Sequence, residues 1–88
     1  MDEPVVESKY DQVFELVSKE CGAQLRKWGR QNHDPLKWVV ILGEEVGEAC
    51  KAALEEEADL HLTELIHVAA VAVSAAECFL RLQEKTGE

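Results

Sequence analysis

The sequence predicts an all-α protein, a three-helix protomer whose helical bundle is completed by oligomerisation. Strand signals are absent, because no alternating run of β-branched residues bounded by turn dipeptides occurs in the 88 residues. Apolar residues recur instead at three- and four-residue spacing in the segments 4–28, 34–57 and 59–85. Between Leu65 and Leu80 the last segment is apolar around most of its circumference, and such a helix is buried on several sides. Two neighbours from one short chain hardly supply that burial, so we expect a homodimer or homotetramer.

The first helix is expected to run from Pro4 to about Trp28. Proline is favoured in the first turn of a helix, and Gly29 provides a stop signal. The apolar residues at helical spacing are Val6, Tyr10, Val13, Phe14, Val17, Cys21 and Leu25. The polar segment 30–33 then connects this helix to the next.

The second helix has strong start signals, because Asp34 is a good N-cap and Pro35 suits the first turn. It is expected to reach about Glu57. Its apolar face is expected to consist of Val39, Leu42, Val46, Ala49, Cys50 and Ala53. Gly43 and Gly47 flank this face, and each glycine costs a helix interior roughly 0.5–1 kcal/mol relative to alanine. We interpret them as a site of close helix–helix approach.

The third helix is expected to take Asp59 as its N-cap and to reach about Lys85. The connection at Ala58-Asp59 is so short that the second and third helices should lie antiparallel and adjacent. The sequence contains no repeat, linker or low-complexity segment, so we expect residues 1–88 to form a single helical domain.

The charge of the chain argues against two classes of partner. Eighteen acidic and nine basic side chains give a net charge of −9, which disfavours nucleic acid and anionic membrane surfaces. The apolar run Leu65–Leu80 is too short to span a bilayer and is interrupted by His67 and Glu77. An anionic small molecule would need a cation to bridge it to the acidic groups.

Cysteine usage and the chain start favour a cytoplasmic protein. Cys21, Cys50 and Cys78 are odd in number and lack metal-site spacing, which favours free thiols in a reducing compartment. The opening residues Met1-Asp2-Glu3-Pro4 have neither the basic nor the apolar region of a secretory signal.

Glu44, Glu45 and Glu48 form the first candidate site feature, and they are expected on the face of the second helix opposite the apolar one. Residues three and four apart share a helix face, so these carboxylates lie within an arc of about 100° and repel one another unless a cation lies between them. The alternative is a solvated acidic face, on which Lys51 pairs with Glu48 or with Glu55 at the surface.

Glu64 and His67 form the second feature. Glu64 falls on an apolar stripe, where a carboxylate must be paired, protonated or bound to a metal. Alternatively, Glu64 occupies a fringe position near the helix start and His67 is a hydrogen-bonded core residue. Taken with the glutamates of the second helix, Glu64 completes an oxygen-rich group suited to Mg²⁺, with Mn²⁺ possible.

The paired motifs resemble a known family. The stretches 32–38 and 41–49, with Glu-Glu-x-x-Glu, and the segment 64–73 are similar to small members of the MazG-like all-α nucleoside triphosphate pyrophosphohydrolases. The resemblance covers about residues 24–79. It implies a helical dimer or dimer of dimers, Mg²⁺ dependence, and cleavage of (d)NTPs to the monophosphate and pyrophosphate. By position, it assigns Glu45, Glu48 and Glu64 as metal ligands and Glu44 as an additional acidic group.

His67 occupies the place of the family's final aspartate. Imidazole is a poor ligand for Mg²⁺ and a fair one for Mn²⁺ or softer metals. Three interpretations remain open: His67 binds a different metal, acts on water or phosphate from outside the coordination sphere, or marks a weakened site. Because all four carboxylates are present, we favour a working site with His67 outside the tightest coordination.

Further roles follow from this hypothesis. Glu44, free of the metal, would orient or deprotonate the attacking water as the catalytic base. Lys51, Arg26, Lys27 and Arg30 are candidate phosphate-binding residues. Trp28 or Trp38 is a candidate for stacking on the base, and the alternative for both is packing in the core or at an interface. Two other functions stay open, namely a catalytically silent nucleotide- or metal-binding relative and a helical interaction module.

Overall fold

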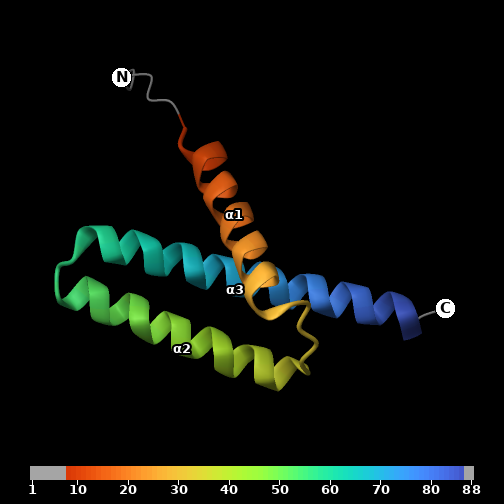
Figure 1. The fold of residues 1–88 in the computed structure, drawn as a ribbon. Coiled ribbons are helices and arrows are strands. Elements are labelled where there is room, and N and C mark those ends of the chain that lie inside the picture. The colour runs from red at the N-terminus through yellow and green to blue at the C-terminus, as the bar shows by residue number, and fades with distance from the viewer. Residues whose placement is uncertain (1–7, 87–88) are drawn as a thin grey trace, which may run out of the picture.

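The computed structural model describes residues 8–86, and its helices are α1 (Tyr10–Trp28), α2 (Pro35–Leu54) and α3 (Ala58–Thr86). No strand occurs within this range, so the all-α prediction is confirmed. Figure 1 shows α2 and α3 lying antiparallel and side by side, as expected from their short connection. α1 crosses α3, and its N-terminal half projects away from the other two helices.

α1 begins later than the sequence predicted. Ser8 and Lys9 are not helical, and the Ser8 hydroxyl accepts a hydrogen bond from the Tyr10 amide at 3.1 Å. A hydroxyl that bonds the backbone two residues further on competes with the helix, so the prediction of a helix through Ser8 is wrong. The predicted start at Pro4 lies outside the described residues. The predicted end at Trp28 is confirmed.

α2 starts as predicted and ends early. The Asp34 carboxylate accepts a hydrogen bond from the Lys37 amide at 2.8 Å, and Pro35 is the first helical residue. The helix stops at Leu54 rather than Glu57, because the chain turns sharply in the next three residues.

That turn is a Schellman motif. The Glu57 N–H donates to the Ala52 carbonyl at 3.1 Å, and the Glu56 N–H donates to the Ala53 carbonyl at 3.2 Å. Glu56 has a φ of 58°, in the left-handed region where this motif usually has glycine. The sequence lacks glycine here, and for that reason the early end of α2 was not predicted.

α3 follows the turn without a spacer. The His61 N–H donates to the Glu57 carbonyl at 2.8 Å, so the helical bonding pattern begins before Asp59. Asp59 therefore lies inside the first turn, and the prediction that it is the N-cap is wrong. Its backbone carbonyl accepts a bond from the Thr63 hydroxyl at 3.1 Å.

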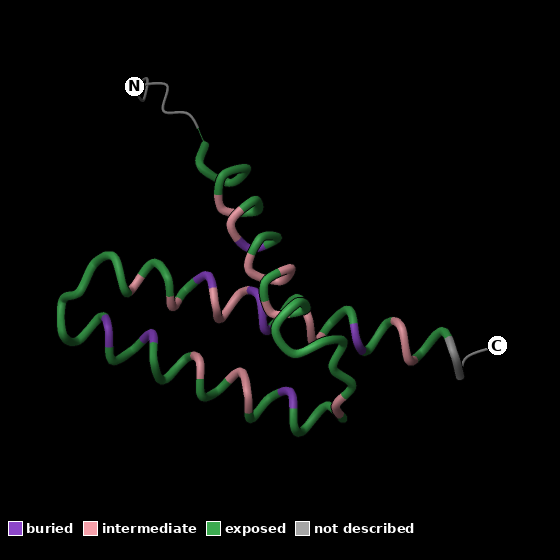
Figure 2. Tube along the Cα trace, viewed as in Figure 1, coloured by how far each residue is buried: buried purple, intermediate pink, exposed green. Residues whose placement is uncertain are grey.

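The core consists of two small clusters along α3 (Figure 2). Where α1 crosses α3, the buried residues are Val17, Ile66 and Ala70. Between α2 and α3 they are Trp38, Val71 and Cys78. The described chain buries eight apolar residues and leaves fifteen large apolar side chains more than 40% exposed. Most of its apolar surface is therefore not covered within one protomer.

The face of α2 that packs on α3 differs from the predicted one. Trp38, Ala49 and Ala52 are buried against α3, whereas Val39 and Val46 are exposed. Of the six residues predicted to form the apolar face, Ala49 alone is buried. Nothing lies within 4 Å of a Cβ built on Gly43 or on Gly47, so the predicted close helix approach is not made within the protomer.

One property of α3 differs from the expectation that its apolar run is too short to span a bilayer. Over Ala58–Glu84 it is long and apolar enough to cross a membrane, judged by length and composition alone. This segment is longer than the apolar run 65–80. A helix buried inside a protein passes the same test, and His67 of α3 contacts side chains of both other helices.

Candidate functional site

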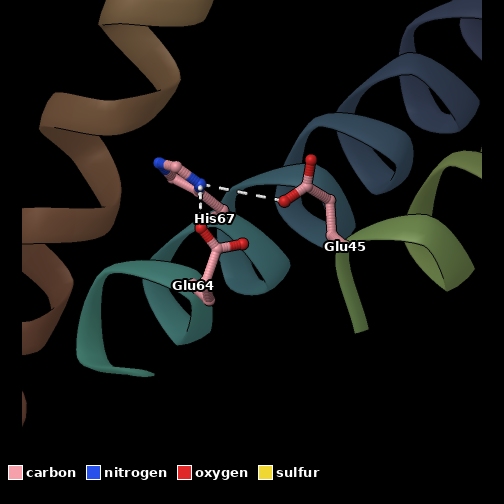
Figure 3. A group of neighbouring side chains, drawn as sticks. All are labelled: Glu45, Glu64 and His67. Carbon is pink, nitrogen blue, oxygen red and sulfur yellow. Dashed lines mark ion pairs between the residues drawn. The ribbon is translucent and has the colours of Figure 1, made fainter. Parts of the chain in front are cut away.

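His67 lies at the centre of a cluster of carboxylates contributed by all three helices. Its Nδ1 is 3.6 Å from Glu64 Oε1, one turn earlier on α3, and 3.8 Å from Glu45 Oε2 on α2. Its Nε2 is 3.6 Å from Glu20 Oε2 on α1. Figure 3 shows Glu64 and Glu45 directed towards the same nitrogen of the imidazole. We call these four residues the acidic centre.

The register of α2 explains why Glu45 belongs to this centre. Glu45 follows Trp38 by seven residues and precedes Ala49 and Ala52 by four and seven, so it lies on the buried stripe that faces α3. From the sequence, all three glutamates of the motif were expected on the face opposite the apolar one. For Glu45 that assignment is wrong, because the helix packs on α3 through a different stripe.

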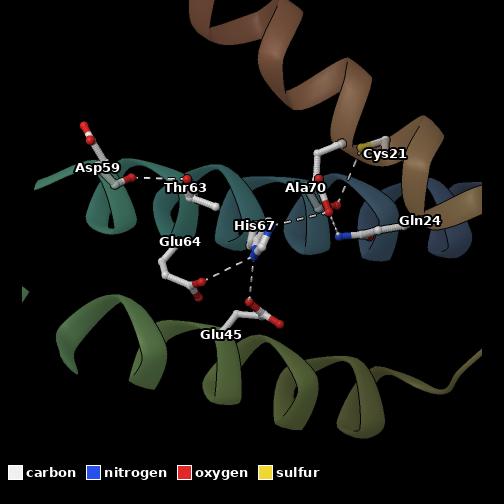
Figure 4. A network of polar contacts seen from close by, with 9 residues as sticks. Cys21, Gln24, Glu45, Asp59, Thr63, Glu64, His67 and Ala70 are labelled. Atoms are coloured by element: carbon white, nitrogen blue, oxygen red, sulfur yellow. Dashed lines mark hydrogen bonds and ion pairs between the residues drawn. The ribbon is translucent and has the colours of Figure 1, made fainter. Parts of the chain in front are cut away.

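Glu20 was not identified from the sequence. It comes three residues after the buried Val17 on the face of α1 that packs on α3, and its Oε2 accepts a bond from Gln24 Nε2 at 3.0 Å. Cys21, next to it, lies against α3, with its sulfur 3.8 Å from the Ala70 carbonyl oxygen (Figure 4). The available signal was the pair Glu20 and Gln24, two polar residues four apart on an otherwise apolar stripe of α1.

Three residues of the acidic centre have possible metal-ligating atoms close to one another. One ligand atom from each of Glu45, Glu64 and His67 can be chosen so that all lie within 4.8 Å of one another. In an octahedral site with metal–oxygen distances of about 2.1 Å, neighbouring ligands are about 3.0 Å apart and opposite ligands about 4.2 Å apart. The contacts of 3.6 and 3.8 Å at Nδ1 match neither value, so these side chains would have to shift to coordinate one ion. Carboxylate oxygens favour Mg²⁺ and Mn²⁺, and the imidazole shifts the preference towards Mn²⁺.

The electrostatics of Glu45 are those of an incompletely compensated carboxylate. Burial raises the pKa of the Glu45 carboxyl above its ordinary value, and the negative charges of Glu64, Glu48 and Glu20 raise it further. His67 acts in the opposite direction and lowers that pKa. The folded protein therefore binds a proton at Glu45 more tightly than the unfolded chain does. A divalent cation at the same place would relieve the same repulsion.

The other two glutamates of the motif lie nearer to solvent. Glu48 is exposed and influences the centre through its charge on Glu45. Glu44 is exposed as well. The structure thus brings Glu45, Glu64 and His67 together and leaves Glu44 and Glu48 at the rim.

The predicted substrate-binding residues are spread over the chain. Lys51 is exposed in the last turn of α2. The Lys27 ammonium lies 4.7 Å from the ring centre of Trp28, and both side chains are exposed at the end of α1. Arg30 follows in the connector and forms part of the wall of a cavity described below.

A cleft leads to the acidic centre from the α1 side. It lies between α1 and the first half of α3, has a volume of about 700 Å³, and includes Glu20 and His67 in its wall. Lys19 and Arg26 of α1 form part of the same wall. Arg26 was a candidate for phosphate contact from the sequence, whereas Lys19 was not identified, because an isolated basic residue on an exposed helix carries no distinctive pattern. We call this the α1–α3 cleft.

Comparisons of the chain with protein-family models, with curated proteins and with solved structures find no match.

Proposed function

We propose that this protein is a metal-dependent nucleoside triphosphate pyrophosphohydrolase that cleaves (d)NTPs to the monophosphate and pyrophosphate. The main support is the convergence of Glu45, Glu64 and His67 from two helices on one small volume. The α1–α3 cleft, with Lys19 and Arg26, adds room and positive charge for a polyphosphate next to it. The motif resemblance described above points to the same reaction.

In this proposal Glu45 and Glu64 are the principal ligands of Mg²⁺ or Mn²⁺, with Glu48 as a further ligand. A cation bound there would neutralise the charge of the phosphate oxygens. His67 contacts the carboxylates at 3.6 to 3.8 Å from inside the centre. In place of the expectation that His67 stays outside the tightest coordination, we therefore propose direct coordination and hence activity with Mn²⁺.

Two carboxylates are candidates for orienting or deprotonating the attacking water. Glu44 is the residue assigned by the motif, and it is free of the centre. Glu20 is fixed by its bond to Gln24 and lies beside His67, so it is the better oriented of the two. The phosphates would contact Lys19 and Arg26 in the cleft, while Lys51, Lys27, Arg30 and Trp28 stay predictions from the sequence.

We also infer that a second copy of the chain covers the exposed apolar side of the α2–α3 pair. Val39 and Phe79 are 62% and 57% exposed, and both line one apolar groove of about 660 Å³ with Trp38 and Ala76. An exposed patch of this kind is typical of an interface between subunits. The same patch is the observation that favours the second candidate function, a helical interaction module.

The test is a pyrophosphate-release assay over ordinary and modified (d)NTPs with Mg²⁺ and Mn²⁺ in parallel. The wild-type protein should release pyrophosphate, and Glu45→Gln and Glu64→Gln should abolish release and weaken Mn²⁺ binding, because each removes a ligand. Glu55→Gln is the matched control, since Glu55 is an exposed glutamate at the end of the same helix as Glu45.

Three outcomes separate the candidate functions. Release that is lost in both variants and kept in Glu55→Gln supports the pyrophosphohydrolase. Calorimetric binding of Mn²⁺ and nucleotide without release indicates a catalytically silent relative. Absence of both binding and release, with helix content unchanged, favours the interaction module.

A further inference from the structure

A second, smaller cavity lies where the end of α1, the connector 29–34 and α3 meet. Its volume is about 240 Å³. The residues that give it chemical character are Gln24, Gln31, Trp38 and Ser74, together with Arg30. We call it the connector cavity, and nothing in the function proposed so far uses it.

The wall of this cavity is fixed by hydrogen bonds. Arg81 donates from Nη1 to Asn32 Oδ1 at 2.7 Å and from Nε to Glu77 Oε2 at 2.9 Å, which ties the connector to α3. The Cys78 sulfur lies 3.8 Å from the His33 carbonyl oxygen, a second tie between the same elements. A cavity with such a wall is largely formed before a ligand arrives, and little ordering is needed on binding.

The chemistry of the wall is that of a site for a planar, uncharged ring with donors and acceptors on its edge. Gln24 and Gln31 each carry an amide donor and an acceptor, and Ser74 adds a hydroxyl. Trp38 is 7% exposed, and its indole Nε1 is buried without a hydrogen-bond partner, although the indole lies close enough to Cys78 to lower the pKa of that thiol. The charged residues of the wall are Glu77, Arg81 and Arg30. Glu77 is bonded to Arg81, and Arg81 and Arg30 lower its pKa, so its negative charge is compensated.

The connector cavity is joined to the acidic centre by one side chain. Gln24 lines the cavity and donates to Glu20 Oε2 at 3.0 Å, and the same oxygen lies 3.6 Å from His67 Nε2. Along α3, Ser74 follows His67 by seven residues, which is about 10 Å of helix. A ligand with a ring at one end and phosphates at the other is long enough to reach from the cavity to the centre, and its path would run past Gln24.

We propose that the connector cavity binds the nucleobase of the substrate, with Gln31 and Ser74 contacting the edge of the base and Trp38 forming the apolar wall. This proposal rests on the proposed function for the phosphate end of the substrate. Binding of the base is a separate property of the chain and is measurable without phosphate or metal.

The first experiment uses nucleosides, which have a base and no phosphate. The four common nucleosides are titrated into the ¹⁵N-labelled wild-type protein without metal, and the two indole N–H signals are followed by NMR. A Trp28→Phe variant serves only to assign the Trp38 signal. We expect at least one nucleoside to shift the Trp38 signal in a saturable way.

The second experiment uses two changes in the cavity and one matched control. Gln31→Ala removes an edge contact, and Ser74→Leu fills part of the space. Each should raise the Kd for the bound nucleoside about three- to tenfold, the effect of one lost hydrogen bond. Gln12→Ala removes an exposed glutamine of α1 that lies outside the cavity, and it should leave the Kd unchanged.

The two proposals fail in different ways. If the Trp38 signal does not move with any nucleoside, or if Gln31→Ala and Ser74→Leu bind as tightly as Gln12→Ala, the base-binding cavity is refuted even where pyrophosphate is released. If nucleosides bind as expected and no (d)NTP is cleaved, the cavity stands and the pyrophosphohydrolase is refuted. Where release occurs, Gln31→Ala should raise KM for the nucleotide and leave binding of inorganic tripolyphosphate with Mn²⁺ unchanged.

Discussion

Glu20 and His67 join the first and third helices at the acidic centre, with His67 Nε2 3.6 Å from Glu20 Oε2. The other ring nitrogen of His67 faces Glu64 and Glu45, so one imidazole has carboxylates from all three helices around it. Three carboxylates around one side chain repel each other and are retained at a cost in stability. Such a cost is typical of a site that binds a ligand.

The first prediction concerns the charge at Glu45. Because burial and neighbouring carboxylates raise the pKa of Glu45, replacing it with neutral glutamine should stabilise the metal-free protein at neutral pH. We expect a gain of a few tenths of a kcal/mol for each repulsive pair removed. Urea unfolding with EDTA present measures this gain, and Glu55→Gln, at an exposed position, should show none. Equal stability of Glu45→Gln and wild type would contradict the electrostatic account.

The second prediction gives the pH dependence of that difference. The pKa of Glu45 is higher in the folded state than in the unfolded chain. The ionised carboxylate therefore destabilises the folded protein in full above the folded pKa, and this destabilisation is absent below the unfolded pKa. The stability of the wild type relative to Glu45→Gln should therefore rise as pH falls through this window. Urea midpoints of both proteins over a pH series measure it. A difference that is constant with pH would show that Glu45 acts through packing rather than charge.

Parts of the fold and site that depend on local sequence signals were predictable. Asp34 before Pro35 predicted the start of α2. The three-residue spacing of Glu64 and His67 placed them on one face of their helix, and the structure brings Glu45 of the neighbouring helix to the same place. Their convergence also needed two helices to be antiparallel, and the short connection between them predicted that arrangement.

Features that depend on tertiary packing were not predictable in the same way. Glu20 joins the acidic centre because α1 crosses α3 at Val17, a crossing that no spacing within α1 specifies. The stripe of α2 that packs on α3 was predicted wrongly for a similar reason. Both sides of that helix carry apolar residues, and the side that is buried is the one with the large Trp38 side chain. Lys19 and Arg26 line the α1–α3 cleft because of the same crossing.

The third prediction concerns the left-handed residue in the turn between α2 and α3. Glu56 has a φ of 58°, which costs a residue with a side chain about 1 kcal/mol relative to glycine. Glu56→Gly should therefore stabilise the protein by about 1 kcal/mol, or roughly 4–8 °C in Tm for a domain of this size. Thermal unfolding by circular dichroism measures it. Glu55→Gly is the control: Glu55 has a φ of −89°, so glycine there should give no gain.

The fourth prediction compares Asp34 and Asp59, which were both expected from the sequence to be N-caps. The Asp34 carboxylate caps α2 through the Lys37 amide, whereas Asp59 lies inside the first turn of α3. Asp34→Ala should cost about 0.5–2 kcal/mol, the usual loss for an N-cap, and Asp59→Ala should cost less. Urea unfolding of the two variants side by side measures the ordering. Equal losses would show that Asp59 contributes a cap-like interaction of its own.

The last prediction tests the second copy of the chain on the apolar groove. Phe79 lines that groove with Val39 and is 57% exposed in the protomer, so in a dimer it would be buried. Phe79→Glu should convert a dimer or tetramer to monomer, because a buried unpaired charge costs several kcal/mol, more than most interfaces tolerate. Sedimentation velocity over a range of concentrations measures the mass.

Leu54→Glu is the matched control, since Leu54 is also exposed but lies outside the groove, at the end of α2. A wild-type protein that sediments as a monomer throughout would refute the interface, and loss of association in both variants would place it elsewhere on the surface.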